Sequence, residues 1–153
     1  MAFNQWEGFK KFEELGVSKT DVVAAGVLFL PENYETEEKE KFFESINMVN
    51  LYKELKAQSI NVKGLIDFGI NDIRIYDRRS DELWIGLIVI QCVVLPIVTG
   101  VLSSYIYDKL HKSKIHLKMR VLNGESLHIK MDYDGDSATL TEILKKISEI
   151  KQK

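Results

Sequence analysis

The chain has 153 residues and a mass of 17.6 kDa, a size that suits one domain. Its 45% apolar and 29% charged residues are ordinary for a soluble globular protein, and two prolines and nine glycines argue against a disordered chain. A net charge of −2 excludes a global basic field that recruits nucleic acid, and the single cysteine, Cys92, excludes disulfide frameworks and all-cysteine metal sites.

The first fifteen residues are predicted to form a helix with an aromatic stripe, and Gly16 can end that helix. The aromatic residues recur at every third position: Phe3, Trp6, Phe9 and Phe12. Acidic and amide side chains interrupt the apolar run that a signal peptide requires. We expect the stripe to dock onto the protein's own core, and binding to a partner or a lipid surface is the alternative.

Residues 21–76 hold several short elements. The apolar run 21–30, closed by Pro31, predicts a buried strand. One or two helices are expected within 36–58, because asparagines near the middle of that stretch can break a helix. Two short strands are predicted at 60–66 and 70–76, and the second alternates apolar and polar residues as a half-buried strand does.

Residues 83–107 contain no Asp, Glu, Lys, Arg or His. As one helix they would extend about 37 Å, longer than the ~30 Å hydrocarbon core of a bilayer. Trp84 at one end and Tyr107 at the other resemble the aromatic residues found at membrane interfaces. We predict a long apolar core helix, kinked or split at Pro96, and the alternative is a single membrane span over 84–107.

Several small or polar residues would lie together on one side of this helix. We expect them to form a packing face that presses closely against a sheet or another helix. They are Cys92, Pro96, Thr99, Gly100 and Ser103. Cys92 is expected to act as a small, inert apolar side chain.

A β-hairpin is predicted around Asn123-Gly124, because alternating runs lie on both sides of it. A two-residue loop would place apolar side chains on both faces. We therefore predict a three-residue loop over 123–125 that pairs Val121 with Leu127 and Met119 with Ile129.

This register would give the hairpin a basic face. Lys118 would lie opposite Lys130, Arg120 opposite His128, and His116 opposite Asp132. Like charges directly opposed destabilise a sheet unless something compensates them. The compensation is expected to come either from acidic residues between 35 and 44 or from an anionic partner, which makes Lys118, Arg120 and Lys130 candidate contacts for an anion or a partner. Nucleic acid is disfavoured as that partner, because no aromatic side chains that could stack on nucleobases lie between these basic residues.

The chain is predicted to end in a helix that carries one apolar stripe. Thr139 and Glu142 have the spacing of a capping box. The preceding D-x-D-G-D segment, which starts at Asp132, fails the calcium-loop pattern. We expect a turn there, with Asp136 or Ser137 as the helix cap.

Arg78 and Arg79 precede the uncharged stretch, with Ser80 as a candidate N-cap of its helix. Guanidinium groups beside a helix N-terminus suit a phosphate, and local ion pairing with capping is the alternative. The histidines and Cys92 form no metal-ligand pattern, and no catalytic motif occurs. We therefore expect no catalytic residues, no metal and no cofactor.

The segment 77–86, DRRSDELWIG, and the apolar stretch after it, which ends VLSSYIYDKL, cover about a third of the chain. They resemble uncharacterised small bacterial proteins with an Arg-Ser-x-Glu-x-Trp segment before a long apolar helix. The resemblance implies a bacterial, non-enzymatic protein and no particular activity.

We predict one α+β domain over residues 1–153, with a small, mostly antiparallel sheet and a hairpin–helix unit packed on the long apolar helix. The expected function is that of a non-enzymatic interaction or regulatory subunit of a larger bacterial assembly in the cytoplasm, with a protein partner or self-association. The alternatives are a single-span membrane protein and a phosphate- or nucleotide-binding module that uses Arg78 and Arg79.

Overall fold

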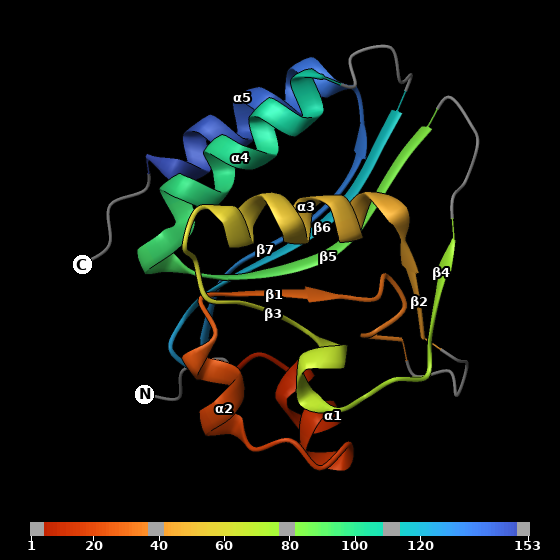
Figure 1. Ribbon diagram of the computed structural model, residues 1–153. Coiled ribbons are helices and arrows are strands. Elements are labelled where there is room, and N and C mark those ends of the chain that lie inside the picture. Colours follow the sequence, from red (N-terminus) through yellow and green to blue (C-terminus); the bar gives the residue numbers. More distant parts are fainter. Residues whose placement is uncertain (1–4, 37–41, 77–81, 109–113, 150–153) are drawn as a thin grey trace.

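A mixed sheet of five strands forms the centre of the protein in the computed structural model, which describes residues 5–36, 42–76, 82–108 and 114–149 (Figure 1). The elements in chain order are α1 (Gly8–Glu14), α2 (Lys19–Ala24), β1 (Val27–Leu30), β2 (Phe42–Ser45), α3 (Ile46–Ala57), β3 (Val62–Gly64), the 3-10 helix η1 (Leu65–Phe68), β4 (Ile73–Tyr76), β5 (Glu82–Gln91), the 3-10 helix η2 (Cys92–Val94), α4 (Leu95–Tyr107), β6 (Lys114–Asn123), β7 (Ser126–Gly135) and α5 (Ser137–Ser148).

The strand order across the sheet is β3-β1-β5-β6-β7. β1 runs parallel to β3 and β5 parallel to β6, whereas the β1–β5 and β6–β7 pairs are antiparallel. β2 and β4 form a separate parallel pair beside the main sheet. The α+β class is therefore confirmed, but the sheet is mixed rather than mostly antiparallel.

The uncharged stretch is not one helix. Its first half is the central strand β5 and its second half is α4, joined by η2. A strand covered on both faces is apolar throughout, so it lacks the alternation that would distinguish it from a buried helix. Pro96 lies in the first turn of α4, where its missing N–H leaves no bond unmade, so it starts the helix instead of kinking it. Within the described ranges, no helix has the length and apolar character needed to cross a membrane.

Helices cover both faces of the sheet (Figure 1). On one face, side chains of α3, α4 and α5 join the larger apolar core. On the other face, Trp6, Phe9 and Phe12 belong to a second buried cluster with β1 and β5. These three members of the aromatic N-terminal stripe thus dock onto the protein's own core, as expected, and Phe3 lies outside the described residues. Tyr34 belongs to the same cluster, and its buried hydroxyl donates to the carbonyl of Gly8 at the start of α1 (2.9 Å).

Two stretches differ from the prediction: 21–30 is not one strand, and 36–58 holds the strand β2 before its helix. Ser18 caps α2, so the run 21–30 is a short helix followed by the four-residue strand β1. Ser45 ends β2 and caps α3, its Oγ accepting from the Met48 amide (3.3 Å). A serine hydroxyl that accepts from an amide of the first turn is a common start of a helix.

The predicted packing face of the apolar helix is only partly buried. Thr99 packs inside and Cys92 is buried in η2, whereas Pro96 and Gly100 are exposed. The face that contacts the core consists of larger side chains: Leu95, Val98, Leu102, Tyr105 and Ile106. The small-residue face was predicted from a continuous helix that included Cys92, and α4 begins only at Leu95.

The hairpin forms with a register different from the prediction. The turn has two residues, Gly124 and Glu125, and the register shifts by one residue between Val121 and Leu122. Val121 therefore pairs with Ile129 instead of Leu127. Because of the bulge, Leu122 and Leu127 belong to the second buried cluster, whereas Val121 and Ile129 belong to the larger core. At the end of β7, Asp136 caps α5 by accepting from the Thr139 amide (2.9 Å), as expected.

Candidate functional site

Arg120 is the buried cation of the hairpin, with 2% of its surface exposed. Its Nε donates to Glu35 Oε2 (3.2 Å) and its Nη2 to Glu35 Oε1 (2.6 Å). Its Nη1 donates to Asp132 Oδ1 (2.8 Å) and to two backbone carbonyls of the hairpin. An acidic residue of the segment that begins at 35 therefore compensates this charge internally.

The observed register also changes the neighbours of the two lysines. Lys118 lies opposite Asp132, and its Nζ donates to the carbonyl of Glu32 (3.2 Å). Lys130 lies opposite Arg120, is exposed, and lines an open polar hollow of about 430 Å³ next to Trp6. Contact of Lys118 and Lys130 with an anionic partner stays a prediction.

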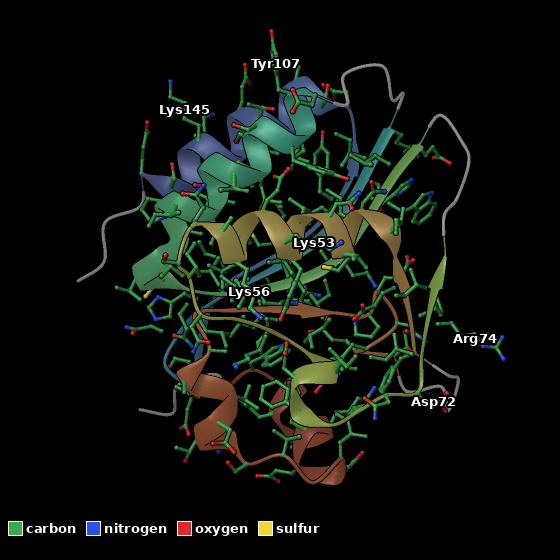
Figure 2. All side chains as sticks on the ribbon, viewed as in Figure 1. Lys53, Lys56, Asp72, Arg74, Tyr107 and Lys145 are labelled. Atoms are coloured by element: carbon green, nitrogen blue, oxygen red, sulfur yellow. The ribbon has the colours of Figure 1, made fainter. Side chains whose placement is uncertain are left out.

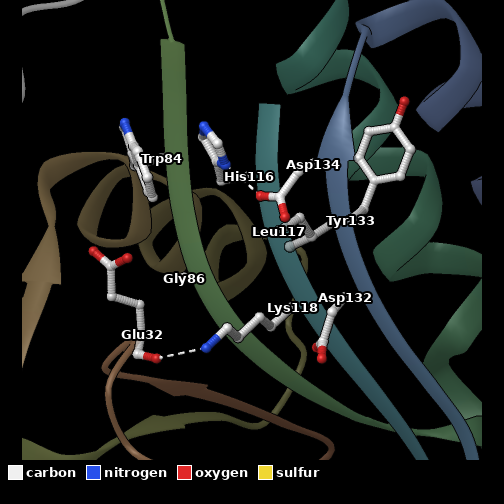
Figure 3. Close-up of a pocket in the computed structure, with 9 residues that line it drawn as sticks. All are labelled: Glu32, Trp84, Gly86, His116, Leu117, Lys118, Asp132, Tyr133 and Asp134. Atoms are coloured by element: carbon white, nitrogen blue, oxygen red, sulfur yellow. Dashed lines mark hydrogen bonds and ion pairs between the residues drawn. The ribbon is translucent and has the colours of Figure 1, made fainter. Parts of the chain in front are cut away.

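A small polar pocket lies beside these residues on the same face of the sheet (Figure 3). Trp84 of β5 stacks on His116 of β6, with ring centroids 3.7 Å apart and an interplanar angle of 13°. His116 Nε2 lies 3.0 Å from Glu82 Oε1, and its Nδ1 contacts Asp134 Oδ1. The cavity that they border measures about 70 Å³.

The contacts of His116 occupy both nitrogens of its ring. Each ring nitrogen of His116 faces a carboxylate oxygen, one from Glu82 of β5 and one from Asp134 of β7. Among the residues that the structure describes, no group of three or more His, Cys, Asp or Glu side chains is arranged to hold a metal ion.

A mostly apolar pocket of about 340 Å³ lies between α3, the β3–η1 junction and the β2–β4 pair, and residues of both apolar clusters line it. We call it the α3–β4 pocket, because those two elements supply half of its lining residues. Its lining residues are Phe29 of β1, Glu44 of β2, Met48, Val49, Tyr52 and Lys53 of α3, Gly64, Leu65 and Ile66 at the β3–η1 junction, and Asn71, Ile73 and Ile75 at and before β4.

Hydrogen bonds fix one wall of the α3–β4 pocket. Asp67 Oδ2 accepts from the Tyr52 hydroxyl (2.9 Å) and from the Gly64 amide (2.7 Å), which ties α3 to the start of η1. Lys56 donates to the same Tyr52 hydroxyl (3.0 Å). The pocket therefore has a wall that exists before any ligand binds.

Glu44 is the acidic group of this pocket. Burial among apolar side chains raises the pKa of its carboxyl to about 7, because removal of water disfavours the charged form. A titratable group with a shifted pKa inside a well-formed apolar pocket is typical of a binding or active site.

Two isoleucines extend the apolar surface beyond the pocket. Ile66 is 66% exposed and Ile75 is 59% exposed, although both line the pocket wall. Arg74 of β4 points outward from the protein, and Asp72, which is also exposed, lies just before the strand (Figure 2). The alternation predicted for 70–76 thus gives β4 an apolar face toward the pocket and a charged face toward solvent.

The remaining predicted contacts, Arg78 and Arg79, lie outside the described residues. The helix N-terminus on which their phosphate site depended is not present, because the chain continues from Glu82 as the strand β5. The sequence pattern also did not single out Glu44 or Ile66. The one signal in that region was the alternation of Ile73 and Ile75, which did not show the wall that they would face.

Compared with protein-family models, curated proteins and solved structures, the chain has no significant match.

Proposed function

We propose that this protein is a non-enzymatic interaction module that binds a partner protein through the α3–β4 pocket. The observation that carries the proposal is the combination of a preformed apolar pocket with Ile66 and Ile75 exposed at its rim. Exposed apolar surface that continues into a pocket is a common feature of protein–protein contact sites. The partner is expected to insert one bulky apolar side chain and to cover the two isoleucines.

The exposed rim favours a protein over a small molecule as the occupant. A small ligand buries most of its own surface inside a pocket of this size. It would leave the outer parts of Ile66 and Ile75 in water, whereas a polypeptide segment that crosses the pocket would cover them. Anchoring by one buried side chain with surrounding contacts that exclude water is the usual arrangement in protein interfaces.

Glu44 gives the proposed interaction a pH dependence. A partner that covers the pocket removes more water from the Glu44 carboxyl and thereby favours its protonated form. We therefore expect binding to weaken as the pH rises from about 6 to about 8. The neutral carboxyl can remain in the interface and donate a hydrogen bond to the partner.

Selection of peptides from a random linear library on the immobilised protein tests the proposal. We expect enriched peptides to share a bulky apolar residue and to bind the variants Ile66→Asp and Ile75→Asp at least about tenfold more weakly than the wild type. Ile97→Asp is the matched control, because Ile97 is 50% exposed on α4 and lies outside the pocket. Circular dichroism and thermal unfolding establish that all three variants fold.

Two results contradict the proposal. One is the enrichment of peptides that bind the Ile66→Asp and Ile75→Asp variants as tightly as the wild type. The other is the absence of any enriched peptide while the apolar dye 8-anilinonaphthalene-1-sulfonate binds the wild type and not the rim variants, which would assign the pocket to a small molecule.

The proposal includes the cellular setting expected from the sequence, a regulatory subunit of a larger bacterial assembly in the cytoplasm. Fractionation after carbonate and high-salt washing tests the location. We expect the protein in the supernatant without detergent, and retention in the membrane fraction would contradict the proposed setting.

A further inference from the structure

The strand β7 forms one edge of the five-stranded sheet. It spans ten residues and pairs with β6 along one side. On its other side, the described residues supply one backbone partner, Gln5 at Ser126, the first residue of the strand. A long edge strand is a template for pairing with another strand, and natural proteins usually cover or interrupt it.

The charges of β7 are arranged in opposite halves about Met131. Lys130 precedes Met131, and Asp132 follows it. His128 and Asp134 each lie three positions from Met131, one on either side of it. All four polar side chains are exposed. When such a strand pairs antiparallel with a copy of itself, the basic half of each copy faces the acidic half of the other.

We propose that two copies of this chain form a symmetric dimer by antiparallel pairing of β7 with β7, centred on Met131. In this register Lys130 of one copy lies opposite Asp132 of the other, twice by symmetry. Met131 lies opposite its own copy, and Ile129 lies opposite Tyr133. The two sheets then join into one continuous sheet of ten strands.

The neighbouring registers are unfavourable. Residues directly opposite each other in an antiparallel pair share a face of the sheet, so only registers centred on a residue keep polar and apolar side chains apart. Centring on Lys130 would oppose it to its own copy, and centring on Asp132 would oppose two carboxylates. Like charges directly opposed are destabilising, which leaves Met131 as the centre that opposes unlike charges.

The apolar side of β7 supports the same pairing. Ile129, Met131 and Tyr133 pack against the larger core but are only partly buried. A second β7 would bring the same three side chains of the other copy beside them and remove more of their surface from water. The regular part of the proposed pairing covers residues 129–133, beyond the bulge at His128, so Ser126 and its bond to Gln5 lie outside it.

Charge reversal combined with mixing tests the dimer. Sedimentation equilibrium of the wild type is expected to show a dimer. Lys130→Asp would oppose two pairs of carboxylates, and Asp132→Lys would oppose two pairs of lysines, so each is expected to weaken dimerisation at least about tenfold. An equimolar mixture of the two variants is expected to restore the dimer, because a strand with acidic side chains at both positions then faces a strand with lysines at both.

Lys145→Asp is the matched control, because it makes the same charge change on the exposed surface of α5, where the Lys145 side chain points away from the sheet (Figure 2). It is expected to leave the dimer unchanged. Since Asp132 also accepts from Arg120, circular dichroism of Asp132→Lys must first show a folded protein. A monomeric wild type, a dimer insensitive to Lys130→Asp, or a mixture that stays monomeric although both variants are folded would each overturn the proposal.

Discussion

Arg120 on β6 and Glu35, which lies 85 positions earlier in the chain, form a two-armed ion pair on one face of the sheet. Glu35 Oε2 also accepts from the indole Nε1 of Trp6 (2.9 Å). The pair therefore ties the N-terminal helical layer to the centre of the sheet. Because Arg120 is almost completely buried, its charge depends on these partners for stabilisation.

Arg120→Met should destabilise the protein strongly. The substitution keeps much of the apolar volume but leaves the partly buried Glu35 carboxylate without its cation. Breaking one side of a buried pair typically costs about 3–5 kcal/mol. Urea unfolding followed by tryptophan fluorescence measures the change in the free energy of unfolding.

The double variant Arg120→Met/Glu35→Met separates the pair from its packing. Removal of both charges is expected to recover most of the lost stability, since buried pairs are often replaceable by apolar side chains of similar size. If the single variant Arg120→Met were as stable as the wild type, or the double variant no better than the single, the buried pair would not have the role that we assign to it.

The same pair shows how far the sequence leads. The sequence predicts that either acidic residues between 35 and 44 or an anionic partner compensate the positive charges of the hairpin. Glu35 is an acidic residue of that segment, and it pairs with Arg120. The predicted register is nevertheless wrong, because a two-residue turn and a one-residue bulge together reassign every cross-strand pair. Alternation identifies the strands of a hairpin, but a bulge leaves no mark in that alternation strong enough to fix the pairing.

The uncharged stretch shows a second limit. The composition of 83–107 correctly indicated an element at the centre of the fold, since β5 lies in the middle of the sheet. It did not show whether the chain there is strand or helix, because a strand buried on both faces loses its period of two. The α3–β4 pocket was beyond prediction for another reason: its walls come from elements whose packing together no local pattern reports.

Gly86→Ala is expected to destabilise the protein by about 1–3 kcal/mol. Gly86 has a φ of 122°, a conformation that side-chain-bearing residues rarely adopt, and it lies where the β5–β6 register shifts. An added Cβ would also stand 2.6 Å from Met48 Cε, so that side chain would have to move. Thermal unfolding measures the change.

Gly100→Ala is the matched control for this substitution. Gly100 is exposed on α4 with open space around its Cα, and alanine inside a helix is favoured over glycine by about 0.5–1 kcal/mol. The two glycine-to-alanine changes should therefore shift the melting temperature in opposite directions. A Gly86→Ala protein that melts at or above the wild-type temperature would contradict the assignment of strain to this position.

Glu44→Gln is expected to change how stability depends on pH. Burial holds the pKa of Glu44 at about 7 in the folded protein, against an ordinary value of 4.5. Between these two values the folded state binds more protons than the unfolded state, so this group makes the free energy of unfolding fall as pH rises. The loss approaches about 3 kcal/mol above pH ~7, and glutamine, which does not ionise, avoids it.

Urea unfolding at about pH 4.5 and about pH 8 tests this, with near-equal stabilities expected at the lower pH and a more stable Glu44→Gln variant at the higher. Glu142→Gln on the exposed side of α5 is the control, because a solvated carboxyl there should give no such pH-dependent gain. Equal stability of wild type and Glu44→Gln at the higher pH would show that the Glu44 carboxyl is solvated. The expected pH dependence of partner binding would then have no basis, because it rests on a desolvated carboxyl in the pocket.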